Sequence, residues 1–397
     1  LQATYEGGSQ QLAKALNNLR NEVSRSAMNL TPVRMNSDEI YQILRTRLFE
    51  SVPDAKQVMA VAQSYSKALH EARQMDITNK KPEDLATEIK ISYPFHPAIR
   101  DLYARFKENP GFQQTRGLIR LMRVFVAGLF NGKNCRAAEL ELIHPFDFDL
   151  NNPETLAEIT NINPSLTNAI SHDIASQGQA VAEMLDDGGR SSDAQDLSRL
   201  ILIASLPNVP NAVLGLSQSE LVAHLCAPKR DLSKIKETLG LLTTKAWYVH
   251  SNREGKIFFK NVQNLVAKLR TMAESLNRET SLKELRQCLT DVFKPHQKDC
   301  YQEVLVLPAI DEIDLNQDKV TLILAEPHQD GIDPQLRNFY NDQPYKNRVL
   351  FLTGARDILE SILEASREKK AIDMILAEMR SEKVADNDPQ MVTATEL

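Results

Sequence analysis

The sequence has little of several residue types on which other classes of protein depend. It contains 14 glycines and one tryptophan in 397 residues, and its four cysteines lie far apart with no CxxC pair. Scarce glycine alongside abundant leucine and alanine favours a mainly helical protein. Widely spaced cysteines are typical of a reducing compartment, so we expect a cytoplasmic protein. No apolar run reaches the roughly 18 residues of a membrane span, so no membrane partner is expected.

The motifs of common enzyme classes are also missing. The sequence has no P-loop of the form G-x-x-x-x-G-K-S/T, no G-x-S-x-G elbow, no H-E-x-x-H helix and no G-x-G-x-x-G turn. The nearest approach to a P-loop, Gly132 with Lys133, lacks both the upstream glycine and the hydroxyl residue. This chain therefore cannot hold a nucleoside triphosphate by itself, and we assign no catalytic residue within it.

Two groups of residues have the chemistry of metal ligands but not the spacing. Cys288, His296 and Cys300 lack a fourth ligand at a suitable separation along the chain. The second group is an acidic loop without the strand-fixed carboxylates that two-metal catalysis uses. It comprises Asp311, Glu312, Asp314 and Asp318. We predict free thiols and a solvated loop, and we assign no metal site.

The overall composition is that of ordinary globular material. Hydrophobic residues make up 42% of the chain, charged residues 25%, and the net charge is -6. An acidic balance argues against nucleic acid covering the whole surface, but a local basic patch is compatible with it. The first residue, Leu1, stands in what reads as a polar helix. We therefore expect residues 1–30 to be the tail of an upstream element in a longer protein.

The densest motif is the stretch 93–126, YPFHPAIRDLYARFKENPGFQQTRGLIRLMRVFV. Pro94 and Pro97 fix an extended entry, and we interpret His96 between them as a packed or capping residue. A helix with Ile99, Leu102, Tyr103 and Phe106 on one face is predicted next, and it ends at Asn109–Gly111. A second helix begins near Gln113. Its apolar residues fall on one side, and its arginines fall on the other: Arg116, Arg120 and Arg123.

No Asp or Glu between Gln113 and Val126 can pair with these arginines within the helix. Phosphate is a suitable partner because guanidinium groups bind its oxygens in bidentate fashion. A solvated helix face, or salt bridges to another element, is the alternative that the residues leave open.

The same stretch carries a family resemblance. Together with the upstream segment PV…EI…ILRTRLFE (Pro32, Val33, Glu39, Ile40, Ile43–Glu50), it resembles a bacterial family of large P-loop ATPases from phage-defence islands, similar to the PglY and BrxC ATPases of BREX systems. The resemblance implies that residues 31–132 form an AAA+ lid-like helical domain. It also implies that Arg116, with Arg120 beside it, senses nucleotide phosphate, and that ATP and Mg²⁺ are held mainly outside this segment.

Residues 193–278 are predicted to form a winged helix. Ser217 and Glu220 form a capping box at its second helix, Asp231 caps its third, and Trp247–Phe259 has the pattern of a hairpin. Basic residues gather at the third helix and the hairpin, so we predict binding to the backbone of double-stranded DNA there. The predicted DNA-binding residues are Lys229, Arg230, Lys234, Lys236, Arg253 and Lys256. A winged helix used only for packing or protein contact is the open alternative.

The remaining segments complete the expected domain order. Residues 133–192 are predicted to be a helical connector with a short strand at Leu140–His144, and Asp147 and Asp149 are interpreted as a loop and capping cluster. Residues 279–380 are predicted to be an α/β domain ending in a long helix, Asp357–Arg380, and residues 381–397 a flexible tail. The parallel strands of the α/β domain are expected at Glu303–Leu307, Val320–Ala325 and Arg348–Thr353.

The predicted fold class is therefore mainly α with α/β: a helical AAA+ lid-like unit, a winged helix and a small C-terminal α/β domain. The predicted function is that of the C-terminal portion of a bacterial anti-phage defence ATPase of the BREX type, which couples the ATP state of an absent core to DNA or partner binding. Other defence proteins and further copies of the chain are the expected protein partners. One alternative is a protein interaction module that binds no DNA, and a stand-alone transcription regulator is disfavoured by the acidic balance.

Overall fold

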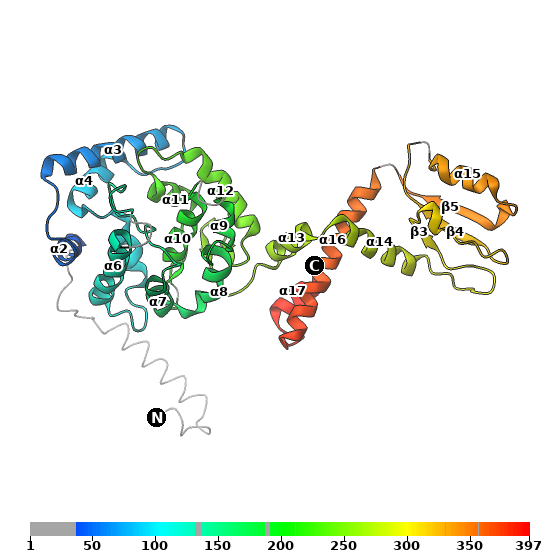
Figure 1. Ribbon diagram of the computed structural model, residues 1–397. Helices are drawn as coiled ribbons and strands as arrows, with labels where there is room; N and C mark the ends of the chain where they lie inside the picture. Colours follow the sequence, from blue (N-terminus) through cyan, green and yellow to red (C-terminus); the bar gives the residue numbers. More distant parts are fainter. Residues whose placement is uncertain (1–36, 132–135, 187–190, 211, 330, 356) are drawn as a thin grey trace, which may run out of the picture. The chain divides into compact units, whose positions relative to one another are not determined.

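The computed structural model describes residues 37–397 except 132–135, 187–190, 211, 330 and 356, and the described chain is mainly helical with two small β-sheets (Figure 1). The mainly α class with an α/β part is thus confirmed. Among the described helices, none combines the length and the apolar character that a membrane span needs. The predicted tail at 1–30 lies outside the described residues, as do Pro32 and Val33 of the upstream part of the family motif.

The chain divides into two compact units, Leu1–Val52 and Pro53–Leu397. The described part of the first contains α2 (Ser37–Leu48), in which Tyr41 and Leu44 are buried. The second begins at an exposed segment that includes Pro53, and Asp54 caps α3 by accepting a hydrogen bond from the Gln57 backbone N–H at 2.8 Å. The observed boundary differs from the predicted one at residue 31 because exposed residues 50–54 separate α2 from α3.

Four helices form the start of the second unit. They are α3 (Ala55–Gln74), α4 (Pro82–Ser92), α5 (Ala98–Phe106) and α6 (Gln114–Asn131), and α3 lies along α4 (Figure 1). The predicted apolar faces of α5 and α6 are buried, so the helical periodicity of the 93–126 motif is confirmed. Gly117 is required there because an added Cβ would overlap the backbone oxygen of Phe112.

The described segment between α6 and α7 (Pro153–Ile162) contains little regular structure. The strand predicted at Leu140–His144 is wrong: only Ile143 pairs, in a single parallel bridge to Phe95. Two hydrogen bonds form this bridge, from the His96 N–H to the Ile143 oxygen at 2.8 Å and from the Ile143 N–H to the Pro94 oxygen at 2.9 Å. Pro94 has no N–H to extend the ladder, which explains why it stops there.

The helical core centres on α10 (Asp193–Ser205), whose described side chains are almost all buried. It contacts α5, α9 (Val181–Leu185), α11 (Gln218–Leu225) and α12 (Leu232–Lys245). The connector preceding α9 contains α7 (Pro153–Ile162) and the short helical turns η1 (Pro164–Leu166), α8 (Thr167–Ala169) and η2 (Ile170–Ile174). These helices form the framework that places the loops of the candidate site.

A small antiparallel sheet follows α12. It consists of β1 (Val249–Ser251) and β2 (Ile257–Phe259), and Leu216 adds a bridge to Ile257 on the other edge of β2. The predicted hairpin is therefore confirmed. The capping box is also confirmed, because Ser217 Oγ accepts from the Glu220 N–H at 3.3 Å and Glu220 Oε2 accepts from the Ser217 N–H at 2.8 Å. Asp231 caps α12 by accepting from the Ser233 N–H at 3.1 Å.

The C-terminal part has a parallel sheet of order β3 (Leu305–Val306), β4 (Thr321–Ala325) and β5 (Val349–Thr353), so the three parallel strands predicted there are confirmed. Its core is formed by residues of α14, the sheet and α16, including Leu285, Leu324 and Leu363. The elements are α13 (Leu265–Ser275), α14 (Arg278–Val292), β3 (Leu305–Val306), η4 (Ile310–Glu312), β4 (Thr321–Ala325), α15 (Pro334–Asp342), η5 (Lys346–Arg348), β5 (Val349–Thr353), α16 (Ile358–Ser381) and α17 (Pro389–Glu396).

Two boundaries in this part differ from the prediction. The predicted flexible tail at 381–397 is wrong, because it forms α17, in which Met391 and Ala394 are buried with 3% and 1% exposure. Leu265 of α13, Ile375 of α16 and Met391 of α17 belong to one core cluster. The division predicted between 278 and 279 therefore runs through a packed cluster of helices.

Candidate functional site

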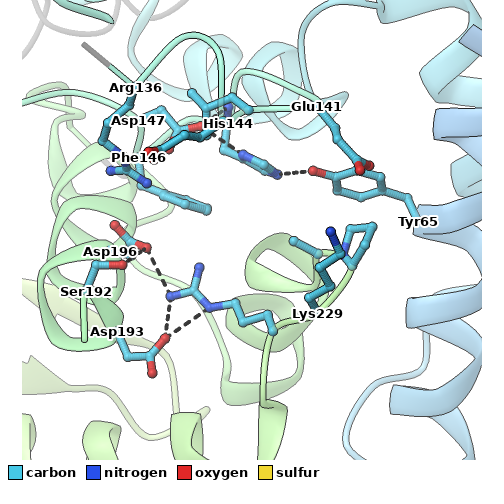
Figure 2. A pocket seen from close by; sticks show the side chains of 15 residues that line it. Tyr65, Arg136, Glu141, His144, Phe146, Asp147, Ser192, Asp193, Asp196 and Lys229 are labelled. Atoms are coloured by element: carbon cyan, nitrogen blue, oxygen red, sulfur yellow. Dashed lines mark hydrogen bonds and ion pairs between the residues drawn. The ribbon is translucent and has the colours of Figure 1, made fainter. Parts of the chain in front are cut away.

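The candidate site is a cavity of about 310 Å³ in the second unit. Its walls come from α3, the loop 136–147, the start of α10 and the turn between α11 and α12. Figure 2 shows Tyr65, His144 and Glu141 on one side of the cavity. Asp193 and Asp196 lie together on a second side, and Lys229 lies on a third. Segments far apart in the sequence therefore bring ionisable side chains to one place.

A hydrogen-bonded chain of Tyr65, His144 and Asp147 forms one wall. Asp147 Oδ2 accepts from the His144 N–H at 2.7 Å and from His144 Nδ1 at 2.8 Å. Because an ionised carboxylate can only accept, Nδ1 carries a proton, and in the neutral ring Nε2 is then the acceptor for the Tyr65 hydroxyl, 3.0 Å away. All three side chains are buried.

The environment shifts the pKa values at both ends of this chain. Burial raises the pKa of Tyr65, and the charge of Asp147 raises it further, so the phenol keeps its proton. Burial alone would raise the pKa of Asp147, but the His144 ring, its hydrogen bonds and the charge of Arg136 together lower it. Tyr65 therefore acts as a donor here and Asp147 as an ionised acceptor.

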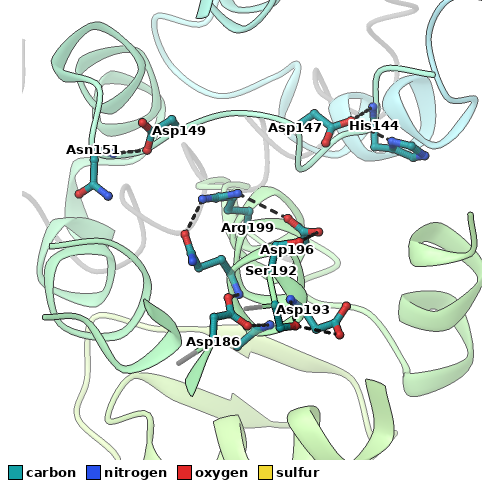
Figure 3. A network of polar contacts seen from close by, with 12 residues as sticks. His144, Asp147, Asp149, Asn151, Asp186, Ser192, Asp193, Asp196 and Arg199 are labelled. Carbon is teal, nitrogen blue, oxygen red and sulfur yellow. Dashed lines mark hydrogen bonds and ion pairs between the residues drawn. The ribbon is translucent and has the colours of Figure 1, made fainter. Parts of the chain in front are cut away.

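Arg230 forms the opposite wall with two acids from the first turn of α10. Its Nη2 lies 2.7 Å from Asp193 Oδ1 and 3.0 Å from Asp196 Oδ2, and its Nε donates to Asp193 Oδ1 at 3.1 Å. Asp196 also accepts from Ser192 Oγ at 3.1 Å, and Arg199 Nη1 lies 3.5 Å away (Figure 3). Burial raises the pKa of Asp196 despite the charges of Arg230 and Arg199.

Three histidines lie together at the cavity wall, and His144 is the one that lines the cavity. The ring of His96 is 5.3 Å from that of His144 and 6.4 Å from that of His224, between centroids. His96 Nδ1 accepts from the Ala98 N–H at 3.1 Å at the start of α5, so the prediction of a packed, capping histidine is confirmed. Burial and the neighbouring histidines lower the pKa of His96 well below its usual value, and burial lowers that of His224 to about 4.

The predicted nucleotide-sensing residues lie on α6 and do not line the cavity. Arg116 and Arg123 are exposed and form no ion pair with a described residue. Arg120 Nε lies 2.8 Å from Glu158 Oε2 of α7, with the arginine side chain 41% exposed. For Arg120, the alternative of a salt bridge to another element is the one observed.

The predicted DNA-binding residues are found in two different environments. Lys229 and Arg230 line the cavity, where Arg230 is engaged in the ion pairs described above. The others lie on the surface: Lys234, Lys236 and Arg253 are exposed, and Lys256 Nζ lies 3.4 Å from Glu254 Oε2. The sequence patch from 229 to 236 is therefore not one continuous surface.

The groups weighed as metal ligands show no such arrangement in the described part of the chain. No set of three or more His, Cys, Asp or Glu side chains there is placed to hold a metal ion. Asp311, Glu312, Asp314 and Asp318 are all exposed, as predicted for a solvated loop. Cys288 is half-buried and Cys300 is exposed, and both are free thiols.

Sequence reasoning missed the site residues Tyr65, His144, Asp193 and Asp196. The spacing of His144 and Asp147 was a usable signal, since an acid three residues after a histidine can accept from its backbone and ring. The two acids of α10 looked like ordinary first-turn residues that favour the helix dipole. Their partner Arg230 follows 37 and 34 residues later, and no local pattern reveals such a pairing.

Comparison with known proteins gives one partial match. A family model described as the DUF499 second domain matches residues 35–203. The match covers α3–α6, the loop 136–147 and most of α10, and thus much of the cavity wall. No curated protein and no solved structure matches the chain.

Proposed function

We propose that this chain is a DNA-binding portion of a phage-defence ATPase of the BREX type, with residues 193–259 acting as a winged helix. The supporting order is α10, the bridging residue Leu216, α11, α12 and the β1–β2 hairpin, in which Leu216 and β1 flank β2. Three helices followed by a hairpin, with the third helix before the hairpin, is the arrangement in which that helix enters the major groove.

The observation that carries the proposal is the two-sided character of α12. Leu232, Ile235, Leu239 and Leu242 are buried against the protein. The outward residues Lys234, Lys236 and Lys245 are exposed together with one acid, Glu237, and neither Lys236 nor Lys245 pairs with an acid in the described chain. A helix anchored on one side and cationic on the other can lie in the major groove and contact phosphates at its edges.

The hairpin provides the second contact. Asn252 Oδ1 accepts from the backbone N–H groups of Glu254 at 3.0 Å and Lys256 at 2.9 Å, and Gly255 takes a φ of +73° that favours glycine. This ordered turn presents Arg253, which is exposed. In the proposed complex, Arg253 binds the DNA backbone beside the groove that α12 occupies.

The nucleotide-linked part of the proposal rests on α6. Arg116 is exposed near the start of that helix and has no ion pair with a described residue, so its guanidinium is free to meet a phosphate. Arg120 is held by Glu158 and is better suited to fixing α6 on α7. We assign the response to ATP and Mg²⁺, bound mainly elsewhere, to Arg116.

A protein-binding role is the second candidate. Leu241 lies on the outward side of α12 and is 43% exposed. An apolar side chain there suits a protein surface better than a DNA groove. DNA binding would depend on the exposed lysines and on the salt concentration, whereas protein binding through Leu241 would not. An experiment that varies charge and salt therefore distinguishes the two functions.

The test is fluorescence anisotropy with unrelated DNA duplexes over a range of salt concentrations. We expect binding that weakens with salt, and a loss of roughly tenfold or more in the double variant Lys234→Glu/Lys236→Glu. The matched control is Lys56→Glu/Lys67→Glu, which makes the same charge change on exposed residues of α3. Absent or salt-insensitive binding, or equal losses in both variants, would favour the protein-binding role.

The nucleotide role is tested in the protein that joins this chain to a P-loop domain. Arg116→Ala should lower ATP turnover and leave the melting temperature unchanged. Arg123→Ala, another exposed arginine of α6, is the control. Unchanged turnover in Arg116→Ala would remove this residue from nucleotide sensing.

A further inference from the structure

The cavity has cationic groups whose hydrogen-bonding capacity is unused within the described chain. Arg136 and Lys229 line it and form no ion pair with a described residue. Arg230 uses Nε and Nη2 for Asp193 and Asp196, and its Nη1 donates to no described group. Three separate side chains therefore have N–H groups to offer to a ligand.

The inner carboxylates of the cavity are, in contrast, already engaged. Asp147 accepts two hydrogen bonds from His144, and Asp193 and Asp196 share Arg230. The two remaining acids, Glu139 and Glu141, are exposed, where water and salt weaken their repulsion of an anion. The lining therefore carries three basic side chains against five acidic ones, and its unused donors belong to Arg136, Lys229 and Arg230.

We propose that this cavity binds a small phosphate-bearing molecule, whose phosphate oxygens accept hydrogen bonds from Arg136, Lys229 and Arg230. Guanidinium groups suit phosphate because their planar N–H pairs match two of its oxygens. The volume of about 310 Å³ is at the lower end for ligand pockets and fits a molecule of nucleoside monophosphate size. This site is separate from the exposed lysines of α12 and does not depend on the proposed DNA binding.

The location of the site gives the ligand a structural role. Lys229 and Arg230 belong to the turn that joins α11 to α12, and Asp231, the next residue, caps α12. Arg136 comes from a loop about ninety residues earlier in the sequence, and Tyr65 and His144 line the space between (Figure 2). A phosphate held by both segments ties the start of α12 to the helical core.

Isothermal titration calorimetry of the full chain with AMP tests the proposal. We expect AMP to bind and adenosine not to bind. The double variant Arg136→Gln/Lys229→Gln should lose roughly a hundredfold in affinity, at about tenfold for each charge-assisted hydrogen bond removed. Lys56→Gln/Lys67→Gln on α3 is the matched control and should bind AMP like the parent chain. If the double variant does not fold, Lys229→Gln alone, at an exposed position, should show a tenfold loss.

Three results would overturn the proposal. They are an affinity for adenosine equal to that for AMP, an unchanged affinity in the folded cavity variants, and displacement of AMP by duplex DNA. The last result would assign the cavity to a DNA backbone phosphate instead of a free small molecule. A failure of DNA binding itself, with AMP binding intact, would overturn only the proposed function.

Discussion

Arg230 and Lys234 are four residues apart in the sequence, yet they occupy opposite environments. The Arg230 side chain is 14% exposed and lies between two carboxylates, whereas the Lys234 side chain is 67% exposed and only approaches Asp231, at 3.9 Å. A partly buried, hydrogen-bonded ion pair is part of the fold, and a solvated lysine contributes little to it. The ion pairs of Arg230 therefore stabilise the protein, whereas Lys234 remains available to a ligand.

The largest expected effect that separates the two regions is the loss of Arg230. Arg230→Ala leaves Asp196, which is 2% exposed, with one remaining ion pair among the described residues, to Arg199 at 3.5 Å. We expect the free energy of unfolding to fall by roughly 3–5 kcal/mol, as when one partner of a buried ion pair is removed. Urea denaturation measures it. Lys234→Ala is the control and should change the free energy of unfolding by less than about 0.5 kcal/mol. Equal effects of the two variants would contradict the difference between the two environments.

The buried histidines predict a pH dependence that the surface lysines do not share. The pKa of His224 is about 4 in the folded chain against about 6.5 when unfolded, and that of His96 is also lowered. At pH values between about 4 and 6.5, His224 is protonated more in the unfolded chain than in the folded chain. The free energy of unfolding should therefore fall as the pH drops from about 6.5 to 4, by about 3 kcal/mol for His224 alone.

Unfolding measured between these pH values with the variant His224→Gln tests this expectation. The variant should show a smaller decrease on acidification than the parent chain. Lys236→Gln, on the surface of α12, should leave the decrease unchanged. A parent chain with constant stability over this pH range would contradict the neutral, buried state of these histidines.

A smaller effect is expected at the other wall of the cavity. Tyr65→Phe removes the hydroxyl that donates to His144 Nε2 and leaves a buried acceptor without its partner. We expect a loss of about 1–2 kcal/mol in the free energy of unfolding. The exposed Tyr345, whose hydroxyl bonds to no described residue, provides the control variant Tyr345→Phe. A loss below the error of the measurement would show that the Tyr65–His144 bond contributes nothing.

The smallest effect is expected on α6. Arg120→Ala breaks an ion pair whose arginine is 41% exposed, so the loss in stability should be about 0.5 kcal/mol or less. Glu158→Ala should give the same value, and the double variant should lose no more than either single variant. A loss of several kcal/mol would place Arg120 with Arg230 among the structural arginines.

The parts of the fold that the sequence predicts well are those with local causes. The apolar period of α5 and α6, the Ser217–Glu220 capping box and the hairpin around Gly255 depend on residues within a few positions of one another. The α17 helix was missed because its polar composition hides two residues, Met391 and Ala394, that pack on distant helices. Tertiary burial, not local propensity, decides that segment.

The candidate site was only partly predictable for the same reason. The basic pattern before α12 predicts Lys229 and Arg230 as DNA-binding residues, but it does not place them in the cavity. Arg230 differs from Lys234 in its environment because it pairs with Asp193 and Asp196. These pairs form only when α10 packs against the turn between α11 and α12. Charge clustering along the chain therefore indicates cationic function but not which surface carries it.

The salt dependence of duplex binding tests the central claim most directly. The slope of log affinity against log salt concentration should decrease by about 2 in Lys234→Ala/Lys236→Ala, because about two phosphate contacts are lost. The cavity variant Arg136→Gln/Lys229→Gln should retain the parent slope. If the cavity variant loses the slope and the α12 variant keeps it, the division of the basic residues into a cavity that does not bind DNA and a DNA-binding surface is contradicted.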